Sequence, residues 1–174
     1  EQLANRYDFI DINRVGIFGH SGGGFMATAA ICTYPDFYKA AVSSSGNHDN
    51  NIYNRGWVEI YNGVQESTKT IQTATGKDSI IYTFSSHVPT NMELAKNLKG
   101  HLLLVSGDQD RNVHPAHLLR MANALIQANK NFEMLLIPGA KHGYTGQANL
   151  FFEKKLWFHF AKYLLGDFSS EQFT

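Results

Sequence analysis

Gly19-His20-Ser21-Gly22-Gly23 is the stretch that decides the fold, because it places a serine in a Gly-x-Ser-x-Gly frame between two different patterns. Before it, Val15-Gly16-Ile17-Phe18 is typical of a short buried strand, and after it the small and apolar residues 24–34 predict a packed helix. A strand that passes directly into a helix forces a sharp turn, with glycines two residues either side of the serine letting the chain approach closely. The serine hydroxyl is then held at the carboxyl edge of a sheet, where open α/β folds bind ligands. The stretch therefore predicts Ser21 as a nucleophile.

The same glycines also fit a second pattern, since Gly22-x-Gly24-x-x-Ala27 matches a dinucleotide-binding fingerprint. In that fingerprint the first glycine follows the strand directly, whereas His20 and Ser21 intervene here. The acidic residue expected at the end of the next strand is also missing, because that strand ends in a run of serines at 43–45. The nucleophile interpretation is favoured, and no cofactor is expected.

Composition narrows the possible functions. The 174 residues fit one domain, and 43% hydrophobic residues are enough for a substantial core. Lys and Arg balance Asp and Glu at 15 each, so neither nucleic acid nor an anionic membrane is an expected partner. The sequence has no membrane-spanning stretch and no metal-ligand spacing. The single cysteine, Cys32, is expected in the core.

Four short apolar runs predict strands buried on both faces, at residues 15–20, 40–45, 101–106 and 132–137. Helical patterns separate them, at about 23–34, 91–98, 115–129 and 148–165. Alternating strands and helices predict an α/β domain with a parallel sheet. The region from Asn47 to Pro89 is the least regular, and its polar residues 65–80 predict an exposed excursion.

A serine nucleophile needs a base and a group that orients the base. In a parallel sheet these groups are expected in the loops after later strands, at the same edge as Ser21. The loop after strand 101–106 contains Asp108 and Asp110, and the loop after strand 132–137 contains His142. The resulting order Ser, Asp, His is that of α/β-hydrolases. The Gly-x-x-Asp frame from Gly107 selects Asp110 as the orienting acid, and Asp108 is interpreted as a turn residue with local backbone hydrogen bonds.

Eight histidines compete for the role of base. His142 is favoured because Gly139 and Gly143 give its loop freedom to reach over the sheet, and His114 is the main rival because it lies near the acid. His20 is interpreted as structural, since neighbours at a sharp turn point apart. His142 would deprotonate Ser21, Asp110 would orient the imidazole, and the backbone N–H of Gly22 would supply one oxyanion donor.

These motifs together resemble the catalytic domain of the prolyl oligopeptidase family, in particular a bacterial form of its dipeptidyl peptidase IV-like branch. The resemblance is carried by residues 19–24, 107–114 and 139–143, in the correct order. It implies a serine peptidase that removes dipeptides after Pro or Ala from peptide amino termini. It also implies a periplasmic or secreted location.

The resemblance extends to a substrate pocket. Trp57-Val58-Glu59-Ile60-Tyr61 looks like the short family helix that lines the pocket for the residue before the cleaved bond. Trp57 and Tyr61 would form pocket walls suited to a proline ring, although the alternative is that both are core aromatics. Asn112 would bind the substrate backbone by the same resemblance.

The resemblance also implies what a complete enzyme would add. Residues 1–174 correspond to the C-terminal half of an α/β-hydrolase domain, with about four parallel strands, and lack the upstream strands and the β-propeller. The second oxyanion donor, a tyrosine hydroxyl, would belong to that upstream part, so weak or no activity is expected of this chain alone. Strand 15–20 would have one unpaired side, which predicts self-association into a homo-oligomer.

Two other functions remain open at this stage. A serine carboxylesterase or acyl hydrolase uses the same triad on the same fold. The chain on its own could also be an inert interaction module.

Overall fold

The computed structural model describes residues 1–85 and 88–169. The chain divides into two compact units, one formed by Glu1–His48 with Asn91–Thr174 and the other by Asp49–Thr90. The first unit carries the parallel sheet, and the second carries a helix and a hairpin.

The first unit is built on a four-stranded sheet in the order β1-β2-β5-β6, in which all neighbours run parallel. Its strands are β1 (Val15–His20), β2 (Tyr38–Ser44), β5 (His101–Gly107) and β6 (Glu133–Ile137). The α/β class and the parallel sheet predicted from the sequence are confirmed. β2 begins two residues earlier than expected, because Tyr38 already pairs with Val15 of β1.

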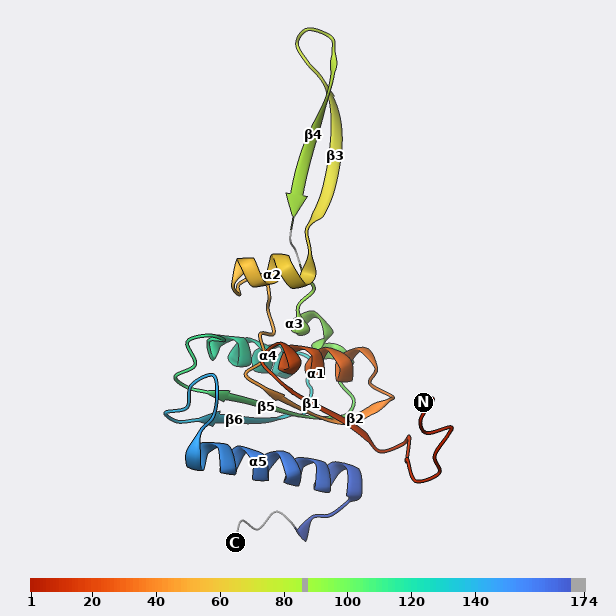
Figure 1. Cartoon of the computed structure of the whole chain (residues 1–174), viewed down its shortest axis with the longest axis vertical. Coiled ribbons are helices and arrows are strands. Elements are labelled where there is room, and N and C mark those ends of the chain that lie inside the picture. The colour runs from red at the N-terminus through yellow and green to blue at the C-terminus, as the bar shows by residue number, and fades with distance from the viewer. Residues whose placement is uncertain (86–87, 170–174) are drawn as a thin grey trace. The chain divides into compact units, whose positions relative to one another are not determined.

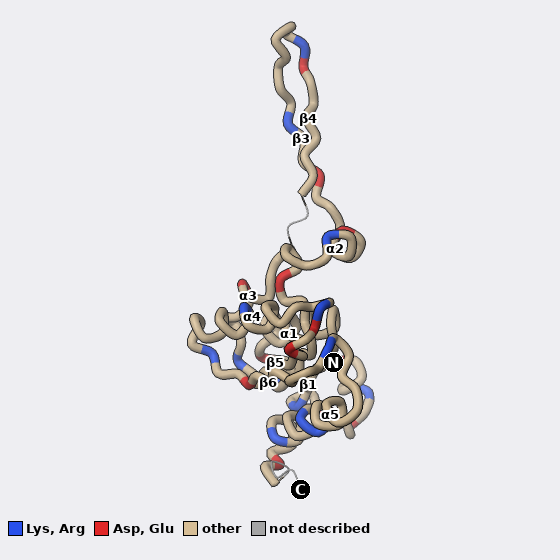
Figure 2. The backbone as a smooth tube through the Cα atoms, turned by 90° about the vertical axis from the view of Figure 1, so that its left-hand side faces the viewer, with Lys and Arg blue, Asp and Glu red and all other residues tan. Residues whose placement is uncertain are grey.

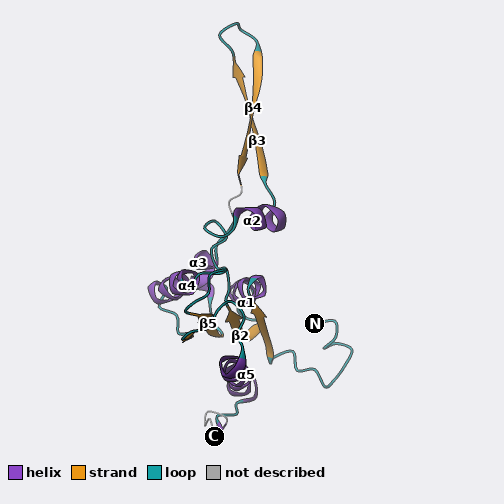
Figure 3. Ribbon diagram, turned by 60° about the vertical axis from the view of Figure 1, so that its left-hand side comes forward, coloured by secondary structure: helices purple, strands orange, loops and turns teal. Residues whose placement is uncertain are grey.

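Helices cover both faces of this sheet (Figure 1). One face carries α1 (Gly22–Thr33), α3 (Asn91–Leu94) with the short 3-10 helix η1 (Ala95–Asn97), and α4 (Ala116–Gln127). The other face carries α5 (Gly146–Phe160), which continues into the π-helical turn η2 (Ala161–Leu165). Figure 3 shows the same layers, with the strands between the helices.

Each face of the sheet has its own hydrophobic core. The larger core packs Ile31 of α1 and Leu125 of α4 against Leu102 and Leu104 of β5, all almost completely buried. The smaller core packs α5 against the other side chains of the central strands, including Val42, Leu103 and Val105. Burying one such side chain is worth about 1.5–3 kcal/mol, so the two cores fix the central strands from both sides.

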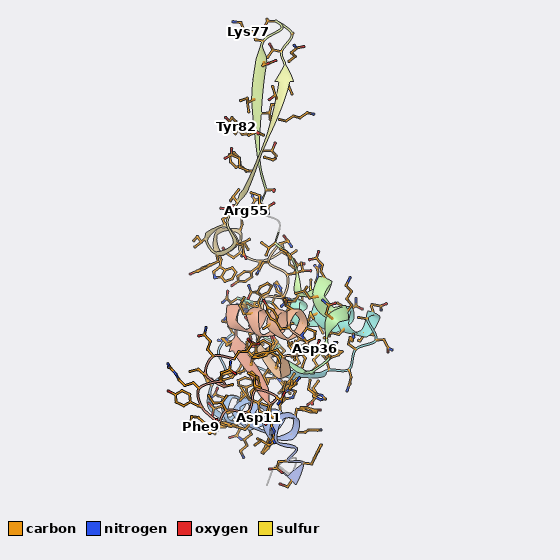
Figure 4. All side chains as sticks on the ribbon, turned by 90° about the vertical axis from the view of Figure 1, so that its right-hand side faces the viewer. Phe9, Asp11, Asp36, Arg55, Lys77 and Tyr82 are labelled. Atoms are coloured by element: carbon orange, nitrogen blue, oxygen red, sulfur yellow. The ribbon has the colours of Figure 1, made fainter. Side chains whose placement is uncertain are left out.

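The second unit differs most from the sequence prediction. It holds helix α2 (Arg55–Asn62) and an antiparallel hairpin of β3 (Gln65–Gln72) and β4 (Asp78–Ser85). The sequence predicts an exposed excursion at the polar stretch 65–80 and no strand there. The stretch is exposed, as at Lys77, labelled in Figure 4, but its backbone forms a regular ladder with a turn at Gly76.

The features that composition predicted can be checked directly. Cys32 is completely buried, as expected. Acidic and basic residues of the described chain are interspersed (Figure 2). In the described part of the chain, no helix is both long enough and apolar enough to cross a membrane.

Candidate active site

The turn between β1 and α1 holds Ser21 in an uncommon backbone conformation. Its φ of 57° and ψ of −121° lie outside the regions that L-residues normally adopt. The turn is fixed on both sides, because the N–H of Ser21 donates to the carbonyl of Ser44 at 2.8 Å and the N–H of Phe25 donates to the carbonyl of Ser21 at 3.0 Å. Strain of this kind persists only where the surroundings impose it, and it is common at functional sites.

The glycines around Ser21 do not all serve the same purpose. A Cβ at Gly19 would lie 2.3 Å from the carbonyl oxygen of Gly23, and one at Gly24 would lie 2.7 Å from that of Ser44. A Cβ at Gly23 would meet nothing within 4 Å. The expectation that glycines two residues either side of Ser21 permit close approach is therefore correct for Gly19 and wrong for Gly23, whose place is taken by Gly24.

Asp110 is held rigidly in the loop after β5. Its side chain is fully buried, and its Oδ1 accepts hydrogen bonds from the backbone N–H groups of Asn112 and Val113, both at 2.9 Å. The second oxygen, Oδ2, lies 2.8 Å from Nδ1 of His142. One carboxylate thus fixes its own loop with one oxygen and meets the histidine with the other.

His142 lies in the loop after β6, with its side chain 26% exposed. His114, the main rival, is used differently. Its Nδ1 accepts from the backbone N–H of Ala116 at 3.1 Å, at the start of α4. Asp110 therefore pairs with His142, which leaves Nε2 of this histidine available to a reacting group.

The two loops that carry Asp110 and His142 are packed directly against each other. A Cβ at Gly107 would lie 2.2 Å from the carbonyl oxygen of Ala140, so this contact needs a glycine. Asp108 lies in a turn, as the sequence predicts, but the prediction that its side chain makes local hydrogen bonds is wrong. Its Oδ1 accepts from the backbone N–H of Gly139 at 2.6 Å, a residue 31 positions away, because the two strand ends are neighbours in the sheet.

A polar cluster next to this pair was not expected from the sequence. The ring of His20 lies 4.7 Å from that of His142, so His20 does not point away from the site as its position at the turn suggested. Nδ1 of His20 lies 2.9 Å from Oγ of Ser44, which donates to the hydroxyl of Tyr144 at 3.0 Å. The serines at the carboxyl end of β2 were the available signal, because polar residues at that end of a buried strand face the ligand edge.

The remaining residues expected in the site are distributed over both units. Gly22, whose N–H the sequence predicts as an oxyanion donor, is the first residue of α1. Asn112 is exposed in the loop of Asp110. Trp57 and Tyr61 both lie on α2 in the second unit, with ring centroids 4.8 Å apart, and the structure does not fix their position relative to Ser21.

Within residues 1–85 and 88–169, the contact of the triad that the structure shows is the one between Asp110 and His142, and it shows no hydrogen bond between Ser21 and His142. Catalytic hydrogen bonds of this kind are often long in unliganded enzymes and tighten when substrate binds. No group of histidine, cysteine, aspartate and glutamate residues that could hold a metal ion occurs within the described ranges.

A parallel sheet with a strained serine elbow, followed by an acid and a histidine at successive strand ends, defines the class of α/β-hydrolases. The chain belongs to the prolyl oligopeptidase family, whose family model matches residues 1–167.

Relatives of known name support this membership. The chain is 32% identical to human dipeptidyl peptidase 8 over 142 residues, which is 82% of this chain and 15% of the relative. It is 26% identical to bovine prolyl endopeptidase FAP over 161 residues, which is 92% of this chain and 19% of the relative. The chain therefore spans less than a fifth of the length of either protein.

Two solved structures share the fold. The crystal structure of a putative dipeptidyl aminopeptidase IV from Bacteroides ovatus superimposes with a TM-score of 0.77 at 24% identity, covering 94% of this chain and 21% of that one. Porphyromonas gingivalis dipeptidyl peptidase 4 gives a TM-score of 0.72 at 24% identity, covering 95% of this chain and 21% of that one.

Proposed function

We propose that this chain carries the Ser-Asp-His centre of a serine peptidase of the dipeptidyl peptidase type, which cleaves after Pro or Ala near the amino terminus of a peptide. The observation that carries the proposal is the contact of 2.8 Å between buried Asp110 and His142, at the sheet edge where the elbow holds Ser21. Membership of the prolyl oligopeptidase family supports it.

The mechanism follows from the roles of the three side chains. His142 Nε2 takes the proton of the Ser21 hydroxyl as Oγ attacks the scissile carbonyl carbon, and then gives that proton to the leaving amine. A water molecule, deprotonated by the same histidine, hydrolyses the acyl-enzyme. Asp110 accepts a hydrogen bond from Nδ1–H of His142, which holds the reactive tautomer and stabilises the imidazolium.

The developing oxyanion needs hydrogen-bond donors, and in this proposal the N–H of Gly22 is one of them. The dipeptidyl peptidase branch takes its second donor from upstream of the segment that this chain resembles. Loss of one such donor typically costs about 10²–10³ in rate. The chain supplies the triad-bearing part of the catalytic domain, and weak activity is expected of it alone.

The aromatic residues of α2 are proposed to recognise the residue before the cleaved bond. Tyr61 is 68% exposed and Trp57 is half-buried, and the ring of Tyr53 lies 5.5 Å from that of Trp57. The three aromatic rings form a row of neighbours, and at least one of them is open to solvent. Such a row is better suited to binding a proline ring than to filling a core. Asn112 is proposed to bind the substrate backbone.

The decisive experiment measures labelling of Ser21 by a fluorophosphonate probe, with Ser21→Ala as control. Labelling of the wild-type chain that disappears in the variant is expected, and equal labelling of both would refute the proposal. A panel of proline and alanine dipeptide amides and short-chain esters then tests the peptidase assignment. Cleavage of the esters alone would instead identify a carboxylesterase.

We also propose that the chain self-associates through the open edge of β1. This strand has β2 on one side, and no strand of the described residues pairs with its other side. Phe18 in this strand is 66% exposed. Unpaired edges with apolar side chains recruit other chains. Light scattering tests this, and a monomeric mass at all concentrations would contradict it.

A further inference from the structure

We propose that His20 is a positioning residue for His142: its ring supports the imidazole of the catalytic histidine, and a hydrogen-bonded chain through Ser44 and Tyr144 holds it there. This inference rests on the proposed function, because it assigns His142 the role of base. In addition to the bond from Asp110, the contact with His20 stops the His142 ring from rotating.

The need for such a support follows from the sheet. β1 and β6 lie at opposite edges, three strand intervals apart, which is about 14 Å at the usual strand spacing. His142 follows β6, yet it must reach the serine that follows β1. The hydrogen bond of 2.8 Å to Asp110 fixes Nδ1 but leaves the ring free to turn about this bond. A second contact is needed to stop that rotation.

His20 supplies this contact. Its ring centroid lies 4.7 Å from that of His142, with 52° between the ring planes. It precedes Ser21 directly, so the support is attached to the same elbow that carries the nucleophile. A shift of the elbow therefore moves the nucleophile and the support of its base together.

His20 is itself held in place by two side chains. Oγ of Ser44 donates to the Tyr144 hydroxyl at 3.0 Å, so the serine lone pairs accept from Nδ1–H of His20 at 2.9 Å. Tyr144 lies two residues beyond His142, and its ring lies 6.0 Å from that of His20 at 84°. The chain of contacts thus returns to the loop that carries the base.

The electrostatics agree with a neutral support. His20 keeps an exposed side, and the partial burial of its ring lowers its pKa below the ordinary value, with a further lowering by His142 and an opposing effect of Asp110. Two further ionisable side chains lie near His20: Tyr144, and Glu153 of α5, which lines a cavity of about 440 Å³ together with His20. A neutral ring at pH 7 supports the imidazolium that forms on His142 without repelling it.

The first test compares His20→Ala and His20→Phe by the rate of fluorophosphonate labelling of Ser21. We expect the alanine variant to label about 10-fold or more slowly, because a small misplacement of a catalytic group can cost 10²-fold. The phenylalanine variant keeps a ring and should recover most of the rate. Melting curves check that both variants fold. Wild-type labelling in a folded His20→Ala chain would overturn the proposal.

The second test does not depend on activity. The titration of His20 is followed by NMR in the wild type, in His142→Gln and in the control His114→Gln. The substitution His142→Gln should raise the pKa of His20, and the control His114→Gln should leave the pKa of His20 unchanged. In His20→Ala, but not in His20→Phe, the His142 ring should show greater motion by NMR relaxation.

The two tests separate the failure of each proposal. If the probe does not label Ser21 in the wild type, while the titration midpoint of His20 and the ring motion of His142 respond as expected, the proposed function fails and the positioning contact stands. If labelling depends on Ser21 and neither NMR quantity responds, His20 does not position His142.

Discussion

Oδ2 of Asp110 lies 2.8 Å from Nδ1 of His142, although 32 residues separate them in the chain. The other oxygen of the same carboxylate accepts two backbone N–H groups at 2.9 Å. The carboxylate is therefore held from one side by its own loop, and it has one orientation in which to meet the histidine. Hydrogen bonds to the charged carboxylate and the complete burial of Asp110 make this pair both rigid and specific.

Asp110→Asn should reduce the rate of Ser21 labelling by about 10⁴-fold, the size found for such a change in other triads. The amide would present N–H donors to the Nδ1–H of His142 and so favour the wrong tautomer. The matched control is Asp108→Asn, which changes a neighbouring carboxylate that bonds the N–H of Gly139 instead. A control that loses as much activity as Asp110→Asn would contradict this assignment.

Gly19→Ala should destabilise the protein by about 1–3 kcal/mol or more, because its Cβ would lie 2.3 Å from a backbone oxygen that cannot move aside. Gly23→Ala, in α1, should be neutral or stabilise by up to about 1 kcal/mol, since alanine is the better helix former and meets no atom. Urea unfolding curves of both variants measure the difference. Equal stability of the two would show that the elbow does not need the close approach.

The thiol of Cys32 should be unreactive in the folded protein. Burial raises its pKa to about 12, against a smaller lowering by Lys130, and its side chain is completely buried. The thiolate is the nucleophilic form, so at pH 8 maleimide should modify the native chain slowly and the chain in urea completely. Rapid modification under native conditions would mean that α1 opens locally.

Stability should fall as the pH drops below about 6.5, in part because of His48. Burial, and secondarily His117, lower the pKa of this side chain from 6.5 to about 3. Between these values the unfolded chain binds a proton that the folded chain does not, so stability is lost as the pH falls, by up to about 1.4 kcal/mol per pH unit.

His48→Asn should flatten the dependence of stability on pH, because asparagine does not titrate. Its side-chain oxygen can take the place of His48 Nδ1, which lies 3.0 Å from Nδ2 of Asn91 in the wild type. The comparison uses the slope of unfolding free energy against pH rather than absolute stability, since the substitution itself changes packing. Identical slopes in the two proteins would exclude His48 as a source of acid sensitivity.

Local patterns were enough to predict much of the fold. The strands and the elbow helix were predicted because central strands are short apolar runs and α1 consists mostly of small and apolar residues. The hairpin of β3 and β4 was missed because β3 is almost entirely polar and because both strands are mostly exposed, so the pair has no buried face. Its β-branched and aromatic residues at 80–84 were the available signal.

The sequence by itself determined the class of sheet, the strained serine elbow and the order Ser, Asp, His, because each depends on residues that are close neighbours in the chain. Only the tertiary structure decided that Asp110 meets His142 rather than His114, that Asp108 crosses to Gly139, and that His20 lies against the base. The physical reason is that strand ends far apart in sequence become neighbours when parallel strands align. Which of their side chains pair is then decided by contacts over a few ångströms, and no local sequence pattern encodes these contacts.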